Sequence, residues 1–245
     1  MSDPAPENSA ESSPAVRQAG STARSRRRGR RASSGQRLFA FDRRLDVRFV
    51  AGADEAGRGC LAGPLVAAGV LFDYDALTTR ELRALSALND SKQHTHEARE
   101  ELYPLVLRSA ARVVVVSRCV RGIDDRGLHK TNLAALRDAL RGVTADIAED
   151  VLCLVDGFSV AEFGRPQRAI VEGDATSAAI AAASIVAKVT RDRYMRHADT
   201  AHPGWRFAEH VGYSTPSHRE AILQNGVSPL HRMSFQSTAY QQLAL

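Results

Sequence analysis

Short apolar runs of strand length recur along the chain and predict five β-strands. They cover residues 48–53, 65–72, 112–117, 151–155 and, with a weaker pattern, 168–171. Pro64 stands just before the second run and argues against a helix there. We therefore expect the first two runs to form a hairpin with an elaborate turn.

Between these runs, leucines recur at close to helical spacing and predict helices over residues 77–88, 95–107 and 128–140. Pro104 is expected to end or kink the second helix, and Gly142 to end the third. A long alanine-rich helix is predicted over residues 175–198. Three strands followed by alternating strands and helices indicate an α/β fold. We expect a mixed five-stranded sheet flanked by helices, with a helical C-terminal appendage from about residue 199.

Positive charge is concentrated in the first 36 of the 245 residues. This segment has seven arginines, six of them between Arg24 and Arg31, and three acidic residues, while the other 209 residues carry only +1 of the net +5. It is rich in Ser, Ala and Pro and has almost nothing large and apolar to bury, so we expect residues 1–36 to be a disordered tail. Residues 37–245 are expected to form one domain. The tail either contacts nucleic-acid phosphates or is only a solubilising leader.

Cysteine usage and hydropathy exclude several classes of protein. Cys60, Cys119 and Cys153 form no C-x-x-C pair, which fits a reducing cytosol and argues against a cysteine-clasped zinc site. The longest uncharged apolar stretch, 178–187, is about half of what a membrane span needs. The N-terminal residues lack the apolar core of a secretory signal. We expect a cytoplasmic protein without membrane contact and, with no sign of an obligate oligomer, a monomer.

Four acidic residues stand at the ends of predicted strands: Asp54 and Glu55 after the first, Asp156 after the fourth and Asp174 after the fifth. Each alone has a structural explanation, since Asp156 precedes a glycine in a turn-like pair and Asp174 suits a helix N-cap. Together they indicate a site, because on neighbouring strands their side chains would converge. Two carboxylates about 4 Å apart repel by about 4 kcal/mol at an effective dielectric constant of about 20, and this repulsion either raises some pKa values or is relieved by bound cations. Such a cluster favours Mg²⁺ or Mn²⁺ over zinc, since no Cys or His adjoins these acids.

A glycine-rich turn follows the first two acids. Neighbouring residues of a straight strand point to opposite faces, so Asp54 and Glu55 share a site only if the strand bends, which Gly57 and Gly59 favour. Residues 57–62 formally match a dinucleotide-binding fingerprint, but the two carboxylates would repel a pyrophosphate and no helix follows. The glycines instead suit close backbone approach to a ligand, with Arg58 available for a phosphate. An ordinary tight turn is the alternative.

Six blocks of residues, in this order, resemble the signature of the ribonuclease HII family, the type 2 ribonucleases H. The blocks are Asp54-Glu55-Ala56-Gly57-Arg58-Gly59 with Leu61-Ala62-Gly63-Pro64, Asn89-Asp90-Ser91-Lys92, Val155-Asp156-Gly157, Gly173-Asp174-Ala175, residues 182–192, and Gly212-Tyr213-Ser214-Thr215 with His218. The resemblance spans about residues 48–235 and excludes the tail. It implies a ribonuclease H-like fold and two-metal hydrolysis of a phosphodiester with Mg²⁺ or Mn²⁺. The bond cut would lie on the 5′ side of a ribonucleotide in RNA/DNA hybrids or duplex DNA, leaving 5′-phosphate and 3′-hydroxyl ends.

The resemblance also implies a role for individual residues. The metal-binding and catalytic carboxylates would be Asp54, Glu55, Asp156 and Asp174. The substrate-binding residues would be Gly57, Arg58 and Gly59 at the 2′-hydroxyl, Tyr213 on the neighbouring deoxyribose, Lys92 at a phosphate, and Ser184 and Lys188 along the same backbone track. Two positions depart from the family pattern, because Glu172 replaces a frequent lysine and Ser214 a frequent glycine. The first weakens a phosphate contact, and the second leaves the geometry of the Tyr213 loop open.

Other polar and aromatic residues are interpreted as structural. Asp192 is expected to pair with Lys188 one helical turn earlier. We expect His94 and His96 to start a helix, His210, His218 and His231 to be satisfied by neighbouring protein groups, and Trp205 and Phe207 to pack the appendage.

Two other functions compete with the endonuclease. One is a non-catalytic nucleic-acid-binding protein that uses the arginine-rich tail, with the acids as turn residues. The other is a metal-dependent phosphatase on a different α/β sheet. The six ordered blocks favour the endonuclease over both.

Overall fold

Five strands form one mixed sheet in the order β3-β2-β1-β4-β5. They are β1 (Phe49–Ala56), β2 (Leu65–Asp73), β3 (Arg112–Arg118), β4 (Val151–Asp156) and β5 (Gln167–Ile170). β2 is antiparallel to β1 and β3, whereas β4 is parallel to β1 and β5. This computed structural model describes residues 32–148, 150–235 and 240, which belong to one compact unit, Ala32–Leu245. The predicted mixed sheet of five strands is confirmed.

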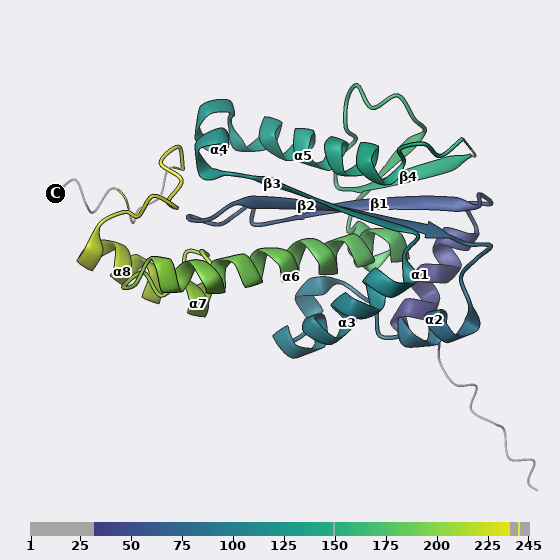
Figure 1. Cartoon of the computed structure of the whole chain (residues 1–245), viewed down its shortest axis with the longest axis horizontal. Helices are drawn as coiled ribbons and strands as arrows, with labels where there is room; N and C mark the ends of the chain where they lie inside the picture. The colour runs from purple at the N-terminus through teal and green to yellow at the C-terminus, as the bar shows by residue number, and fades with distance from the viewer. Residues whose placement is uncertain (1–31, 149, 236–239, 241–245) are drawn as a thin grey trace, which may run out of the picture. The chain divides into compact units, whose positions relative to one another are not determined.

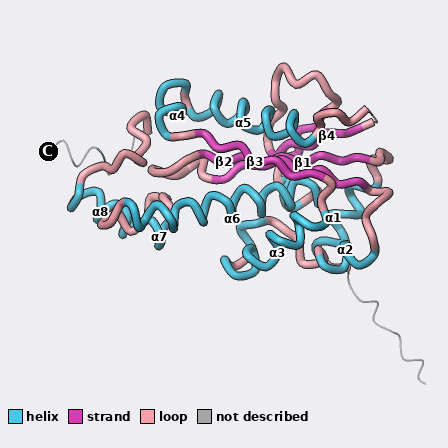
Figure 2. The backbone as a smooth tube through the Cα atoms, viewed as in Figure 1, coloured by secondary structure: helices cyan, strands magenta, loops and turns pink. Residues whose placement is uncertain are grey.

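Helices cover both faces of this sheet (Figure 1), and Figure 2 shows the same layers by type of element. On one face lies α5 (Leu128–Val143), with α4 (Val120–Arg126) before it, and on the other face lies the long helix α6 (Ala178–Ala201). The α6 side also carries α1 (Ser34–Arg43), α2 (Thr79–Ala84), the short 3₁₀ helix η1 (Ser91–Gln93) and α3 (His96–Ser109). The 3₁₀ helix η2 (Gly173–Ala175) precedes α6, and α7 (Phe207–His210) and α8 (Pro216–Asn225) follow it as the predicted helical appendage.

Because both faces are covered, the central strands β1 and β2 are buried at nearly every position. Alternate residues of β1 enter separate cores: Val50 packs toward α6 and Ala51 toward α5. A Cβ added at Gly52 would lie 2.1 Å from the carbonyl carbon of Ala179, so the backbone of α6 lies directly on β1. This close approach brings the N-terminal part of α6 to the end of β1 that carries the acidic residues.

The N-terminal boundary of the folded domain differs from the prediction. Helix α1 begins at Ser34, and Ser33 and Gln36 form a capping box at its start. Residues 32–36 therefore belong to the domain rather than to the tail. The rest of the predicted tail, residues 1–31, lies outside the described residues. The capping box was a readable signal, but the short apolar stretch after it shows too little periodicity to predict α1.

Two helix ends differ from the prediction, and one helix was missed. Pro104 lies inside α3, which continues to Ser109, and Leu102 and Val106 on either side of it are buried in the α6-side core. The expected kink at Pro104 stays a prediction. Gly142 lies inside α5, where an added Cβ would come within 3.0 Å of Val114, so this glycine permits close packing on β3 and does not end the helix. Helix α4 was not predicted at all. None of the helices in the described ranges is long and apolar enough to cross a membrane.

Candidate active site

Two of the predicted carboxylates lie side by side at the ends of parallel strands. Ala53 of β1 is opposite Val155 of β4, so the next residues, Asp54 and Asp156, are neighbours across the ladder. By alternation both side chains belong to the face that α6 covers. The Asp156 carboxylate accepts a 2.8 Å hydrogen bond from the Gly173 N–H, which joins β4 to η2.

Asp54 is buried at this end of the sheet. Its carboxylate accepts a 2.7 Å hydrogen bond from the Glu55 N–H, and the Ser184 hydroxyl of α6 lies beside it, where it acts to lower the pKa of Asp54. Burial, followed by the negative charge of Glu55, raises the pKa of Asp54 well above its usual range. Ser184 thus holds the carboxylate from the helix side, and its hydroxyl also lies 2.7 Å from that of Ser91.

Glu55 approaches the same end of the sheet from the opposite face. Its side chain is hydrogen-bonded to Asn132 of α5 and lies 3.6 Å from the Arg58 guanidinium. Burial raises its pKa, while the positive charge of Arg58 acts in the opposite direction. β1 stays paired with β2 through Ala56, and both Asp54 and Glu55 line the same cavity; the expected bend stays a prediction. The chain turns only at Gly57, where φ is +92°.

Asp174 is paired with a carboxylate that sequence reasoning passed over. Asp90, the N-cap of η1, is hydrogen-bonded to Asp174, and the Lys92 ammonium lies 3.8 Å from Asp174. Burial and the adjacent Asp90 raise the pKa of Asp174 to about 6. Asp174 is not the N-cap of the long helix, because Ser177 has that role in α6. Asp90 belonged to a block that resembled the family, but its contact with Asp174 depends on tertiary structure.

The donors available at this site suit a hard divalent cation. All are carboxylate oxygens, and burial together with mutual repulsion raises the pKa values of Asp54, Glu55 and Asp174. Arg58 and Lys92 offset the negative charge of these carboxylates only in part, and a divalent cation would supply the remaining positive charge. Within the described ranges, no three His, Cys, Asp or Glu side chains are already arranged as a metal-binding group. The residue types fit Mg²⁺ or Mn²⁺, and their present positions specify no coordination geometry.

The predicted substrate contacts converge on one cavity of about 290 Å³ beside these acids. Its lining includes Asp54, Glu55, Asp156, Gly57, Arg58, Gly59, Lys92, Ser184, Lys188 and Tyr213, together with Ser91 and Ala56. Of the predicted site residues only Asp174 is outside this lining, where it contacts Lys92. Residues separated by more than 150 positions in sequence therefore form one concave surface.

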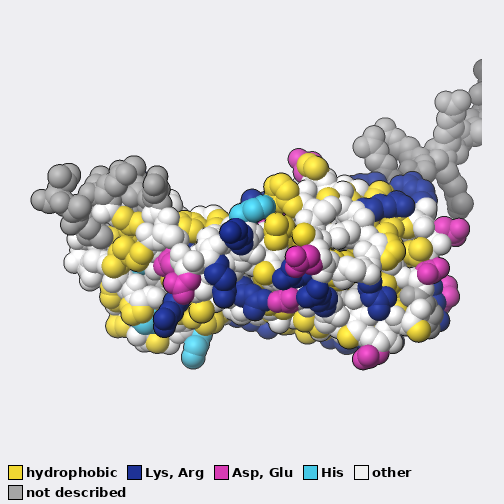
Figure 3. Space-filling view, turned by 90° about the horizontal axis from the view of Figure 1, so that it is seen from above, with side chains coloured by type: hydrophobic (Ala, Val, Ile, Leu, Met, Phe, Trp, Pro, Cys, Tyr) yellow, Lys and Arg dark blue, Asp and Glu magenta, His cyan; other side chains and the backbone are white. Residues whose placement is uncertain are grey.

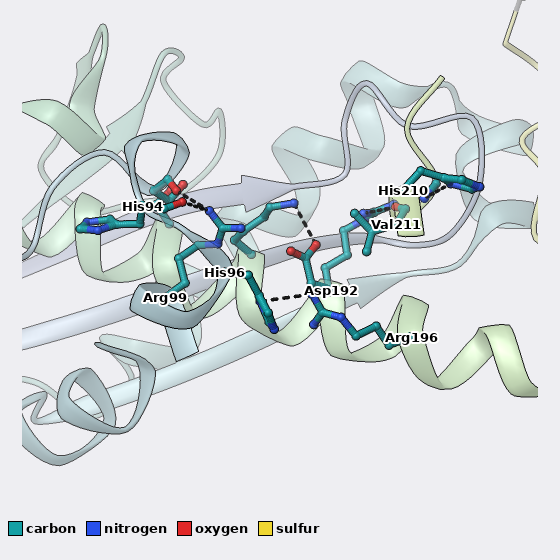
Figure 4. A network of polar contacts seen from close by, with 12 residues as sticks. His94, His96, Arg99, Asp192, Arg196, His210 and Val211 are labelled. Carbon is teal, nitrogen blue, oxygen red and sulfur yellow. Dashed lines mark hydrogen bonds and ion pairs between the residues drawn. The ribbon is translucent and has the colours of Figure 1, made fainter. Parts of the chain in front are cut away.

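Tyr213, a residue 39% exposed, forms part of the cavity wall. The Lys188 ammonium lies 5.0 Å from the centre of the ring and 2.9 Å from Asp192, which confirms the predicted pair on α6. Figure 4 shows this part of α6 and its links to neighbouring segments. Arg99 of α3 donates to the carbonyls of Ser91 (2.9 Å) and His94 (2.5 Å), and so fastens the loop that presents Lys92.

The residues interpreted as structural have structural roles. His96 begins α3 and lies 3.2 Å from Arg196, and Trp205 donates a 3.0 Å hydrogen bond to the Gly226 carbonyl. Phe207 is fully buried, and the rings of His210, His218 and His231 pack against it. None of these side chains lines the acidic cavity.

The opposite face of the sheet carries mixed charge. Seen from the α4–α5 side, Lys and Arg side chains run in a row along the surface with Asp and Glu among them (Figure 3). Several are paired there, including Arg118 with Asp138 and Arg137 with Glu162. This pairing accords with the near-neutral charge of the folded part of the sequence, and it makes the cavity, rather than a broad basic surface on this face, the candidate for substrate recognition.

Comparison with known proteins points to one family. The family model of ribonuclease HII matches residues 51–238. Over 186 residues the chain is 45% identical to a ribonuclease HII of Rhodococcus erythropolis, covering 76% of this chain and 79% of that protein. A ribonuclease HII of Mycobacterium bovis is 44% identical over 186 residues, which are 76% of this chain and 67% of that protein.

Solved structures show the same fold. The ribonuclease H2 of Pyrococcus horikoshii matches with a TM-score of 0.64 at 26% identity, over 80% of this chain and 96% of that one. A ribonuclease HII from Archaeoglobus fulgidus, solved in complex with PCNA, matches with a TM-score of 0.62 at 27% identity, over 77% and 96%. The ribonuclease H-like fold expected from the sequence is thereby confirmed.

Proposed function

Because this chain belongs to the ribonuclease HII family and is thus a ribonuclease H endonuclease, we propose that it hydrolyses the phosphodiester on the 5′ side of a ribonucleotide. Its substrates are RNA/DNA hybrids and duplex DNA with embedded ribonucleotides, and its products carry 5′-phosphate and 3′-hydroxyl ends. One observation carries the proposal: adjacent Asp54 and Asp156 share a cavity with the Gly57–Gly59 turn and Tyr213.

The proposal includes two divalent cations, Mg²⁺ or Mn²⁺, held by Asp54, Glu55, Asp156 and Asp174. When bound, such ions supply the positive charge that activates the attacking water and stabilises the leaving 3′-oxygen. Neighbouring residues of the chain fix the positions of these carboxylates. Ser184 holds Asp54 from the α6 side, Asn132 holds Glu55 from the α5 side, and the Gly173 amide holds Asp156.

Recognition of the substrate is assigned to the cavity wall. The backbone of the Gly57-Arg58-Gly59 turn approaches the 2′-hydroxyl, the group that distinguishes RNA from DNA. Gly59 suits this role, because an added Cβ there would meet open space and the backbone is therefore accessible. Tyr213 offers an exposed ring face to a deoxyribose. Lys92, whose side chain is 83% exposed, can reach a phosphate of the substrate, and Ser184 and Lys188 line the cavity farther along the same nucleic-acid backbone.

The test is cleavage of a duplex that carries a single ribonucleotide, with products mapped at nucleotide resolution in Mg²⁺ and in Mn²⁺. Asp54→Asn should abolish nicking while circular dichroism and duplex binding persist. Asp138→Asn is the matched control, because it removes a carboxylate that pairs with Arg118 away from the cavity. If the wild-type protein leaves the duplex intact in both metals, the proposal is wrong.

The binding-only alternative treats the acids as turn residues, which conflicts with the structure. Asp54 and Glu55 lie inside β1, and side chains from helices on both faces hold them. The monomeric state, the cytoplasmic location and either role of the arginine-rich tail stay predictions.

A further inference from the structure

Two buried arginines stand behind the glycine-rich turn. Arg191 of α6 and Arg232 of the C-terminal segment are fully buried. Every hydrogen bond found for their guanidinium groups goes to a backbone carbonyl of the described chain rather than to a carboxylate. Burying a guanidinium without an anionic partner costs desolvation free energy, so well-formed hydrogen bonds are needed to offset that cost. Burial, followed by the charge of Arg191, lowers the pKa of Arg232 to about 10.

The two arginines hold different parts of the loop. Arg191 donates to the carbonyls of Ala62, Pro64 and Val211 at 2.8–2.9 Å, and so ties the base of the turn to the segment before Tyr213. Arg232 donates to the Gly63 carbonyl at 2.8 and 3.0 Å and to the Arg58 carbonyl at 3.2 Å. Arg232 therefore contacts the Arg58–Gly59 peptide of the turn. Arg191 packs beside Gly57, where an added Cβ would lie 2.0 Å from its Nε, and it donates hydrogen bonds only to the base of the turn and to Val211.

The bond to the Arg58 carbonyl sets the direction of the next amide. A trans peptide is planar, and its C=O and N–H point in opposite directions. Because the Arg58 carbonyl points inward to Arg232, the N–H of Gly59 points away from Arg232. Gly59 is exposed and lines the cavity, and nothing lies within 4 Å of the position of an added Cβ. The Gly59 amide is thus a donor on the open side of the turn.

We propose that Arg232 is a positioning residue for sugar recognition: it fixes the Arg58–Gly59 peptide so that the Gly59 N–H faces the 2′-hydroxyl of the ribonucleotide. This inference rests on the proposed function of the cavity. Both arginines donate to backbone carbonyls, but they have different roles. Arg191 maintains the binding surface for any duplex, and Arg232 maintains the preference for ribose.

The experiment measures affinity in the full-length Asp54→Asn background, for a duplex with one ribonucleotide and for the all-DNA duplex of the same sequence. Adding Arg232→Lys should reduce the ratio of the two affinities about five- to tenfold, the factor expected for one lost hydrogen bond. Affinity for all-DNA should change less than twofold. Arg191→Lys is the matched buried control, and it should weaken both duplexes together and keep their ratio.

A second measurement needs no substitution at Arg232. Amide hydrogen exchange at Gly59, followed in glycine-labelled protein of the Asp54→Asn background, should slow when the ribonucleotide duplex binds and not when all-DNA binds. Equal protection by both duplexes, or an unchanged affinity ratio in a folded Arg232→Lys protein, would overturn the inference. If the Asp54→Asn protein shows no ribose preference and the wild type does not nick, it is the proposed function that fails.

Discussion

Acidification should remove the stability that three buried histidines of the C-terminal appendage contribute. The rings of His210 and His218 stack with centroids 4.0 Å apart, and the Nε2 atoms of His218 and His231 are 3.1 Å apart. All three side chains are buried. We call these residues the histidine cluster.

Hydrogen bonds dictate a neutral state for the cluster. His218 must donate from Nδ1 to the Tyr213 carbonyl (2.8 Å), so its Nε2 accepts from His231. His231 then carries its proton on Nε2, and its Nδ1 accepts from the Ser228 N–H at 2.8 Å. A further proton on either ring would face an N–H donor. His210 obeys the same rule, because its Nδ1 accepts from an amide.

The magnitude follows from linkage. Burial lowers the pKa of His218 and of His231 from 6.5 to about 4. The unfolded chain then binds protons below about pH 6.5, and the folded chain only below about pH 4. The stability that these two histidines contribute is therefore fully present above about pH 6.5, and it is lost as the pH falls from 6.5 to about 4. For one histidine the loss from pH 7 to pH 5 is about 2 kcal/mol, and for the pair it is about twice that, because the unfolded chain protonates both rings in this range and the folded chain neither. Each 2 kcal/mol lowers the Tm of a domain of this size by about 4–8 °C.

The assay is thermal unfolding between pH 7.5 and pH 5 for the wild type, His218→Asn and His197→Asn. His218→Asn keeps a donor near the Tyr213 carbonyl but cannot titrate, so its Tm should fall less on acidification than that of the wild type. His197 is exposed on α6, and its substitution should leave the wild-type slope unchanged. Equal slopes in His218→Asn and the wild type would refute the reasoning, because the raised pKa values of Asp42, Asp54 and Asp174 act on both proteins alike.

Two further predictions concern the turn and the N-terminal helix. Gly57→Ala should reduce nicking at least tenfold and lower the Tm, because φ is +92° and an added Cβ would lie 2.0 Å from the Arg191 side chain; Gly59→Ala, which meets open space, should lower the Tm far less. Comparable Tm losses in the two proteins would contradict this. Asp42, whose pKa burial raises to about 6, accepts a 3.0 Å hydrogen bond from the Ala179 N–H at the start of α6. Its folded pKa is raised, so the stability it contributes is present below about pH 4 and is lost as pH rises through about 6. Urea unfolding of wild type and Asp42→Asn should show this loss only in the wild type, and parallel pH profiles would be evidence against it.

Much of the fold and of the site could be predicted from local sequence. Apolar runs marked β1, β2 and β4 most clearly, since strands buried on both faces must be apolar throughout. The edge strands β3 and β5 are only partly buried, and β5 had the weaker pattern. The alanines of α6 marked a helix that packs closely on a sheet. The acids stood out because acidic residues are depleted from buried strands, and these four stand where such strands end. These signals are local, so they are readable without knowledge of the fold.

Other features depend on how distant segments meet. That Asp54 faces α6 and Glu55 faces α5 follows from which helix covers which side of β1. Asp90 joins Asp174 across 84 positions, and Arg232 reaches the Arg58 carbonyl across 174. No periodicity encodes such partners, because a side chain's hydrogen-bond partner is set by strand register and helix packing. The sequence therefore predicts which residues carry the chemistry of this protein. Which way each side chain points, and which partner it contacts, is decided by the packing of the whole domain.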